Sequence, residues 1–216
     1  SSAASDVYKR QRQYNLKAYR KLVSSAFQDY MIMAMSVKDN VLMGAKFENP
    51  DETAERALKC AGVWEKVQSL SNGIDTVMTK EFDNDGAVLS GGEQQKIVVA
   101  RAFAQKASVK VFDEPSSALD PIAEYDLYKG IMDESKGHIT LFISHRLSSV
   151  KDADIVFMLE NGTVVEYGSH RELMSQKGKY CEMFTKQAQN YLADENYKEE
   201  VGAVSYTHLT LPTTER

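Results

Sequence analysis

The sequence predicts an α/β protein in which a mainly parallel sheet is flanked by helices. Short runs of Val, Ile, Leu and Phe, such as residues 109–112 and 139–143, have the largely apolar character of strands that are covered on both faces. Longer segments between these runs carry the start and stop signals of helices. The alternation of such strands with helices is typical of parallel sheets covered by helices.

In the first half of the interior we expect one strand, then short helices and a loop. Each helix has local signals, which are a Ser at the cap position, a Pro at the first helical position or a Gly after the end. The predicted elements are a strand over 21–27, helices over 36–42, 50–61 and 63–70, and a loop over 71–88.

In the second half, helices and strands alternate more regularly. Ser90 with Glu93, and Ser169 with Glu172, have the spacing of capping boxes, and Asp120-Pro121 is a cap followed by proline. Asn161-Gly162 is a hairpin turn signal. The predicted elements are helices from Ser90 to 105, from Asp120 to 134, from Ser169 and over 178–191, and strands over 109–112, 139–143, 155–159 and 163–166.

Both ends of the chain differ from this interior. Residues 6–11 and 205–214 resemble translated sequencing-adapter sequence, and neither end has a helical or strand period. We therefore expect residues 1–11 to be a non-native N-terminal scar. We expect residues 193–216 to be a tail, of which 204–216 are a second non-native scar, and we exclude both scars from the fold.

Composition restricts the classes of function. The 216 residues are enough for one domain with tails, and 43% hydrophobic with 26% charged residues is ordinary for a globular protein. A net charge of −5 argues against nucleic acid as a partner. Cys60 and Cys181 lack metal-ligand spacing, which favours two reduced thiols. The sequence has no secretory signal and no apolar run near the roughly 20 residues of a membrane span, so any membrane part would lie outside it.

The chemistry is concentrated at the ends of two predicted strands. Asp113 and Glu114 end one strand, and His145 follows the next. Ligands of open α/β sheets bind beyond the carboxyl ends of the strands, where parallel neighbours would bring His145 beside Glu114. One carboxylate suits Mg²⁺, and the other can act as a general base toward water that attacks a phosphoryl group.

A glycine-rich helix start provides a second element of phosphate chemistry. Ser90, Gly91 and Gly92 precede an apolar helix, whose first N–H groups and positive dipole end can bind an anion. A cap needs only Ser90 and Glu93, so we interpret the two glycines as room for a phosphate. The sequence contains no Gly-x-x-x-x-Gly-Lys-Ser/Thr loop, which would hold the nucleotide's other phosphates.

Five motifs in order resemble those of ABC-type ATPase domains. They are the Q-loop (Phe27-Gln28), the signature (Leu89-Ser90-Gly91-Gly92-Glu93-Gln94), the Walker B strand (Phe112-Asp113-Glu114-Pro115), the D-loop (Ser117-Ala118-Leu119-Asp120) and the switch histidine (Ser144-His145-Arg146). The resemblance covers about residues 12–192, and the stretches after His145 and around Ser169 look like the exporter subfamily.

The resemblance implies a truncated ABC-ATPase fold. Residues 12–28 would end the core sheet at the Q-loop, 29–105 would form a helical subdomain, and 106–192 would hold the remaining core and C-terminal helices. We expect the phosphate-binding loop, its lysine and the adenine-stacking aromatic to precede Gln28 in the intact protein. Without the first strands, the sheet would expose an edge and apolar surface, so we expect poor solubility.

Roles follow from the resemblance position by position. Glu114 would be the general base and His145 would contact the γ-phosphate of ATP. Asp113 and Gln28 would act on Mg²⁺, and Gln28 would sense the membrane half. Ser90, Gly91, Gly92 and Glu93 would belong to the signature that binds ATP held by a second ATPase domain. Asp120 would communicate across that dimer.

The resemblance implies an ATP-hydrolysing subunit of an exporter at the cytoplasmic face of the plasma membrane. Its partners would be a second ATPase domain, identical or different, and a transmembrane domain that contacts a groove lined by Met31, Met33 and Met35. We expect the chain alone to be inactive without the phosphate-binding loop. Two alternatives remain open, which are a soluble ABC-type ATPase of chromosome maintenance or translation and a non-catalytic ABC regulatory subunit.

Overall fold

The computed structural model describes residues 15–81, 83–146 and 150–200, with residues 190–200 described by their backbone only. The predicted scar over 1–11 and the end of the predicted tail lie outside these residues. The chain divides into two compact units, the first ending at His145 and the second beginning at Arg146. The expected segment 106–192 crosses this division.

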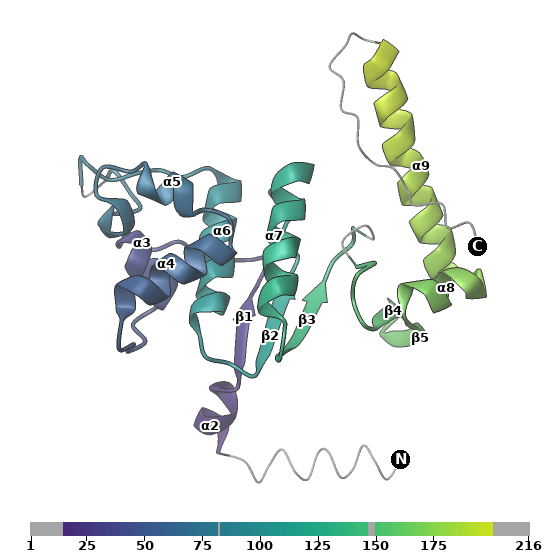
Figure 1. Cartoon of the computed structure of the whole chain (residues 1–216), viewed down its shortest axis with the longest axis horizontal. Coiled ribbons are helices and arrows are strands. Elements are labelled where there is room, and N and C mark those ends of the chain that lie inside the picture. The colour runs from purple at the N-terminus through teal and green to yellow at the C-terminus, as the bar shows by residue number, and fades with distance from the viewer. Residues whose placement is uncertain (1–14, 82, 147–149, 201–216) are drawn as a thin grey trace. The chain divides into compact units, whose positions relative to one another are not determined.

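The first unit is built on a three-stranded parallel sheet, as the sequence predicts. Its strands are β1 (Val23–Ala26), β2 (Val109–Asp113) and β3 (Ile139–Ile143), in the order β1-β2-β3 (Figure 1). Ala26 is in register with Phe112, and Asp113 with Ile143. The carboxyl ends of all three strands therefore lie at one edge of the sheet.

Two long helices cover one face of this sheet. Phe103 of α6 (Gly91–Ala104) packs on Phe112 with ring centroids 5.5 Å apart. Tyr128 of α7 (Pro121–Glu134) packs on Phe142 at 5.7 Å. Because Phe112 and Phe142 are register partners, α6 and α7 lie on the same face, which is the buried side of the core.

The opposite face of the sheet is apolar and exposed in the described structure. Ile139, Leu141 and Ile143 are 62%, 52% and 56% exposed, and Val109 and Val111 beside them are half-buried. The apolar strands predict a sheet covered on both faces, and within the first unit helices cover one of them. Apolar side chains are exposed on the other face of this unit, as the sequence predicts.

A layer of short helices packs on the outer side of α6. It comprises α3 (Val37–Leu42), α4 (Pro50–Cys60), α5 (Trp64–Gln68) and the 3₁₀ turn η1 (Gly73–Asp75) (Figure 1). Ser36 caps α3 as predicted, and the left-handed residue that ends it is Met43 (φ 50°), one position before Gly44. A Cβ on Gly130 of α7 would lie 2.1 Å from the Cys60 carbonyl oxygen, so this glycine permits the contact between α7 and α4.

One short helix was not predicted. Helix α2 (Leu16–Arg20) precedes β1, and the Asn15 side chain caps it by accepting hydrogen bonds from the N–H groups of Lys17 and Ala18. Every residue of α2 is exposed, so there is no buried stripe in the sequence to reveal it.

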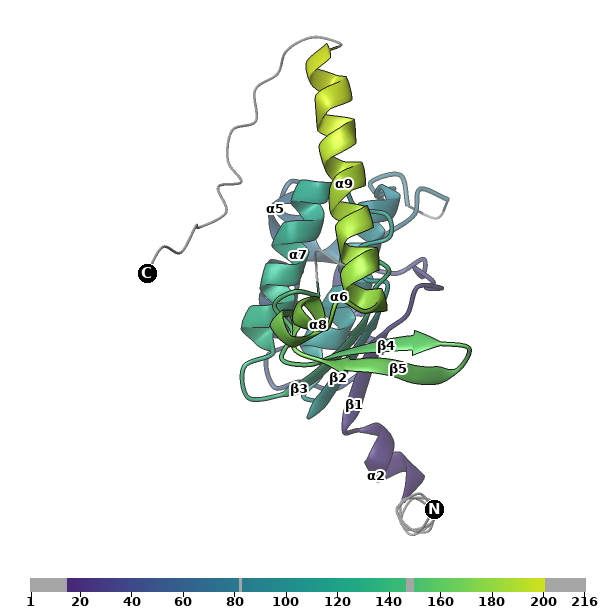
Figure 2. The same ribbon diagram turned by 90° about the vertical axis from the view of Figure 1, so that its right-hand side faces the viewer.

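The second unit is a hairpin followed by two helices. Strands β4 (Val156–Glu160) and β5 (Thr163–Gly168) join at Asn161 and Gly162, both at positive φ, as the turn signal predicts. The hairpin is followed by α8 (His170–Gln176) and then by α9 (Lys179–Glu200) (Figure 2). Ser169 and Glu172 form the predicted capping box at the start of α8. Helix α9 includes residues 193–200, which were expected to be tail. None of the helices among the described residues combines the length and the apolar character that a membrane span requires.

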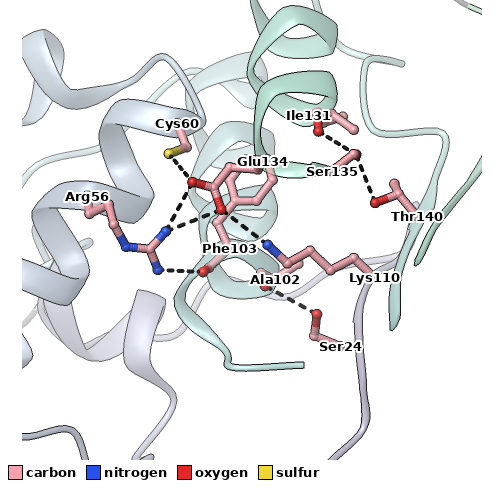
Figure 3. A network of polar contacts seen from close by, with 10 residues as sticks. All are labelled: Ser24, Arg56, Cys60, Ala102, Phe103, Lys110, Ile131, Glu134, Ser135 and Thr140. Carbon is pink, nitrogen blue, oxygen red and sulfur yellow. Dashed lines mark hydrogen bonds and ion pairs between the residues drawn. The ribbon is translucent and has the colours of Figure 1, made fainter. Parts of the chain in front are cut away.

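A polar cluster connects α4, β2 and α7 on the face of the sheet that the helices cover (Figure 3). The Glu134 carboxylate lies 3.3 Å from Lys110 Nζ and 3.3 Å from Arg56 Nη1, and it accepts a hydrogen bond from the Cys60 thiol at 3.3 Å. The Lys110 side chain is only 4% exposed. Because a buried ammonium needs a counter-charge, Glu134 is the partner that allows a lysine inside β2.

The cluster also shifts two pKa values. Burial raises the pKa of the Cys60 thiol to about 11, and the hydrogen bond to Glu134 adds to this shift. Burial alone would raise the pKa of Glu134, but hydrogen bonds from Cys60 and Lys110, with the charges of Lys110 and Arg56, lower it below its usual value. Cys60 is therefore a neutral thiol beside an ionised carboxylate, and it is poorly suited to act as a nucleophile.

Candidate functional site

The acidic end of β2 is held by backbone contacts on both sides of Glu114. Glu114 has a left-handed backbone with φ of 49°, a conformation that costs a non-glycine residue about 1–3 kcal/mol. Its N–H donates to the Ile143 carbonyl at 3.0 Å, and its own carbonyl accepts from Gln95 Nε2 at 2.8 Å. These two hydrogen bonds hold the backbone of Glu114 on both sides of the strained residue.

The Glu114 carboxylate contacts His145, which is the juxtaposition that the sequence predicts. The His145 backbone N–H donates to Oε1 at 3.0 Å, and Nδ1 of the ring lies 2.7 Å from Oε2. The Glu114 side chain is 14% exposed, whereas that of His145 is 68% exposed. The Glu114 carboxylate is thus held in place and still reached by solvent, and its role as general base stays a prediction.

Asp113 and Gln28 lie at the same edge of the sheet, and no hydrogen bond joins their side chains in the described part of the chain. Asp113 ends β2 opposite Ile143, and exposed Gln28 follows β1. The described residues include no group of three or more His, Cys, Asp or Glu side chains that could hold a metal ion. Mg²⁺ is usually held by one or two carboxylates together with substrate phosphates, so the carboxylate of Asp113 and the amide oxygen of Gln28 fit a metal that arrives with a nucleotide.

The start of α6 forms the predicted capping box. The Glu93 N–H donates to Ser90 Oγ at 3.3 Å, and the Ser90 N–H donates to Glu93 Oε2 at 2.8 Å. Lys66 Nζ lies 3.4 Å from the other Glu93 oxygen. Although burial opposes it, the hydrogen bonds with Ser90 and the charge of Lys66 lower the pKa of Glu93. The helix start is thus capped by reciprocal hydrogen bonds, and Ser90 remains exposed.

The two glycines of this helix start have different surroundings. A Cβ on Gly91 would meet nothing within 4 Å, whereas a Cβ on Gly92 would lie 3.0 Å from both the Ala118 carbonyl oxygen and Leu119 Cδ2. The sequence predicts that both glycines leave room for a phosphate, and this role stays a prediction. The structure adds a further reason for Gly92, which is close packing of α6 on residues 118–119, whereas Gly91 is the open position.

Asp120 caps α7. Its Oδ1 accepts hydrogen bonds from the N–H groups of Ile122 and Ala123, both at 3.0 Å. The Ala123 hydrogen bond is the main reason that the pKa of this exposed carboxyl is lowered. The predicted cap is confirmed, and a role across a dimer stays a prediction.

Sequence reasoning missed three side chains that organise the site. Gln95 of α6, only 3% exposed, bonds to the segment that follows β2. Tyr30 donates its hydroxyl to the Gly91 carbonyl at 3.0 Å, joining the segment after Gln28 to the start of α6. Arg101 donates to the carbonyls of Asn40 and Met31. Helical periodicity marks Gln95 and Arg101 only as members of α6, so no local signal would have revealed these partners.

Comparison with known proteins identifies the family of this chain. The sequence profile described as ABC transporter matches residues 4–117, slightly more than half of the 216 residues. The chain belongs to the ABC transporter family. The match begins inside the segment 1–11 that was set aside as non-native, and it includes Ser90 to Glu93, Asp113 and Glu114.

The curated relatives include proteins described as ABC multidrug transporters and are much longer than this chain. The chain is 35% identical over 179 residues to the leptomycin B resistance protein pmd1 of Schizosaccharomyces pombe, covering 83% of this chain and 13% of that protein. It is 33% identical over 173 residues to the ATP-dependent lipid A-core flippase of Alcanivorax borkumensis, covering 80% of this chain and 29% of that protein.

A solved structure supports the ABC fold. The structure described as a bacterial Atm1-family ABC exporter with ATP bound matches with a TM-score of 0.71 and 28% identity. The match covers 80% of this chain and 30% of that chain. An ABC-ATPase fold with a helical subdomain and a parallel sheet is therefore shown, and nucleotide binding is the general property that membership of this family implies.

Proposed function

We propose that residues 12–192 are part of the ATP-binding and ATP-hydrolysing domain of an ABC exporter. The contact between Glu114 and His145 at the carboxyl edge of a parallel sheet carries this proposal, because it joins a candidate base to a candidate phosphate ligand. Family membership and the exporter relatives support ATP as the ligand. ATP hydrolysis in a dimer of such domains would drive a membrane domain that exports substrate.

Each residue at the edge has a role in this proposal. Glu114 accepts a proton from the attacking water, and His145 orients the γ-phosphate and the base. Asp113 and Gln28 would hold Mg²⁺, which supplies charge neutralisation of the phosphates when it is bound with ATP. Exposed Ser90 and open Gly91 offer hydrogen-bond donors to ATP that is held by the second ATPase domain. Asp120 is proposed to reach across that dimer.

The segment after β1 is the proposed docking surface for the membrane domain. Phe27, Met31 and Met33 are 59%, 71% and 38% exposed, although they are apolar. Asn40 and Arg101 hold the backbone of this segment through its carbonyls, so the methionine side chains project from a fixed base. Flexible thioethers suit a surface that must adapt as a partner helix moves. This docking would place the domain at the cytoplasmic face of the plasma membrane.

The 216-residue chain alone is proposed to be inactive, because its sequence has no loop of the Gly-x-x-x-x-Gly-Lys-Ser/Thr type. The test is an ATPase assay with Mg²⁺ on the purified chain beside its Glu114→Gln variant. Equal turnover at the background level is the expected result. Turnover by the unchanged chain above that of Glu114→Gln would contradict the proposed inactivity and would at the same time support the role of Glu114.

The coding sequence that surrounds this chain tests the exporter assignment. An ABC exporter subunit predicts several apolar segments of about 20 residues and a phosphate-binding loop in the same reading frame. A second ATPase domain without such segments, or long heptad repeats, would instead indicate a soluble ABC ATPase. A substituted phosphate-binding lysine would indicate a non-catalytic subunit.

A further inference from the structure

The Gln95 side chain connects the start of α6 to the candidate general base. Its Nε2 donates to the Glu114 carbonyl at 2.8 Å and to Ser117 Oγ at 2.9 Å, and its Oε1 accepts from the Ala118 N–H at 2.9 Å. A carbonyl only accepts and a backbone N–H only donates, so these partners fix the orientation of the amide. Both N–H donors and one acceptor position of this buried side chain are thus used on the segment 114–118.

This segment is strained at the residue that Gln95 contacts. Among the described residues at this edge of the sheet, Glu114 is the only non-glycine residue with positive φ, a conformation that persists only when its surroundings hold it. The N–H of Glu114 is held by Ile143, and the carboxylate is held by His145. Gln95 supplies the contact that holds the carbonyl from the helix side.

Close packing reinforces this connection. Gly92 lies one turn before Gln95, and any side chain there would press on Ala118 and Leu119. The first turn of α6 and the segment 114–119 are therefore packed tightly against each other. The same turn carries Ser90 and Gly91, which are proposed to bind ATP held by the second ATPase domain.

We infer that Gln95 is a positioning residue that holds Glu114 in its catalytic conformation and links it to nucleotide binding at Ser90 and Gly91. This inference rests on the proposed function and deepens it. Gln95 does not touch the nucleotide. It transmits the position of the helix start, which depends on the partner's ATP, to the base that acts on this subunit's own ATP.

The test is ATPase kinetics of the full-length protein that carries this sequence, with Gln95→Met as the main variant. Met has a similar length but neither donors nor a carbonyl. We expect kcat to fall 10- to 100-fold, within the range that a general base contributes, while KM for ATP changes less than threefold. The matched control is Gln105→Met at the far end of α6, which should keep wild-type kcat.

A double-variant comparison separates positioning from general structural damage. In a Glu114→Gln background, adding Gln95→Met should change the residual turnover less than twofold, because the base that Gln95 positions is already absent. Nucleotide-dependent dimer formation by Glu114→Gln should survive the addition. An equal loss of rate in both backgrounds, or an unchanged kcat in Gln95→Met, would overturn the inference.

Folding is checked with a second variant, Gln95→Glu, which keeps the shape and the acceptor for Ala118 but places an acceptor against the Glu114 carbonyl. It should fold and lose at least as much kcat as Gln95→Met. If neither variant folds, Gln95 has a structural role only and the inference is wrong. Absence of turnover in the wild-type full-length protein would overturn the proposed function as well, whereas wild-type turnover with an unaffected Gln95→Met overturns the inference alone.

Discussion

The two partners of the buried ion pair between Glu134 and Lys110 should differ in how much their substitution lowers the free energy of unfolding. Glu134→Gln removes the carboxylate that faces Lys110, and Glu134 is the only carboxylate found in contact with Lys110 among the described residues. At an effective dielectric constant of about 20, unit charges at this separation attract by about 5 kcal/mol. Because Glu134 is 25% exposed and water can partly replace it, we expect a net loss of about 2–4 kcal/mol in the free energy of unfolding.

Replacement of Lys110, the other partner of the ion pair, should lower the free energy of unfolding much less. Lys110→Met replaces a 4% exposed ammonium with an apolar side chain of similar length, and Glu134 keeps Arg56 and Cys60 as partners. The desolvation cost of the charge disappears together with its ion pair, so the expected change is below about 1 kcal/mol. Combining Lys110→Met with Glu134→Gln should recover at least half of the loss.

Urea unfolding provides the assay. Trp64, the single tryptophan, lies in α5 with Lys59 over its ring at 5.5 Å, so its fluorescence follows the first unit. With a slope of about 2 kcal/mol/M, Glu134→Gln should lower the midpoint by about 1–2 M. Low protein concentration limits association through the exposed sheet face. If Lys110→Met lowers the midpoint as much as Glu134→Gln, the reasoning from desolvation is refuted.

Three further predictions concern acid stability, the two glycines and the exposed face. Because the folded-state pKa of Glu134 is lowered, the stability that its ionised form contributes is fully present above the ordinary pKa of 4.5 and is lost as pH falls through the folded pKa. The unfolding free energy of Glu134→Gln, measured by urea titrations between about pH 3 and 6, should therefore depend less on pH. An unchanged pH dependence would count against this prediction. Gly92→Ala should lower the urea midpoint through contact with Ala118 by an amount equivalent to about 1–2 kcal/mol, whereas Gly91→Ala should not, and equal midpoints would show that the contact is not restrictive. Leu141→Thr should weaken self-association of the chain in sedimentation velocity, whereas Val88→Thr in a loop should not, and a monomeric chain at all concentrations would disprove association through this face.

Local signals in the sequence predicted most of the elements. Ser36, Ser90, Asp120 and Ser169 cap helices as expected because a cap depends on a few neighbouring residues. Parallel pairing was also predictable, since continuous apolar strands separated by helices leave few other arrangements. Helix α2 was missed because it buries nothing, and the end of α9 because its polar sequence has no clear stop signal.

The sequence predicts that Glu114 and His145 are neighbours, but it does not predict the hydrogen bonds that hold them in place. Strand order brings His145 to Glu114, and strand ends are visible in the sequence. The left-handed conformation of Glu114 and the three hydrogen bonds of Gln95 depend on how α6 packs, which no local pattern encodes. Gly92 shows the same limit, because the sequence reveals a glycine but not the neighbour that requires it.

ATP turnover by the full-length protein with Glu114→Gln is the measurement that bears most directly on the central claim. If the Glu114 carboxylate beside His145 is the general base, this substitution should reduce kcat at least 100-fold while ATP binding, measured by filter retention of labelled nucleotide, stays within threefold. A variant that hydrolyses ATP at the wild-type rate would show that the chemistry lies elsewhere and would contradict the claim.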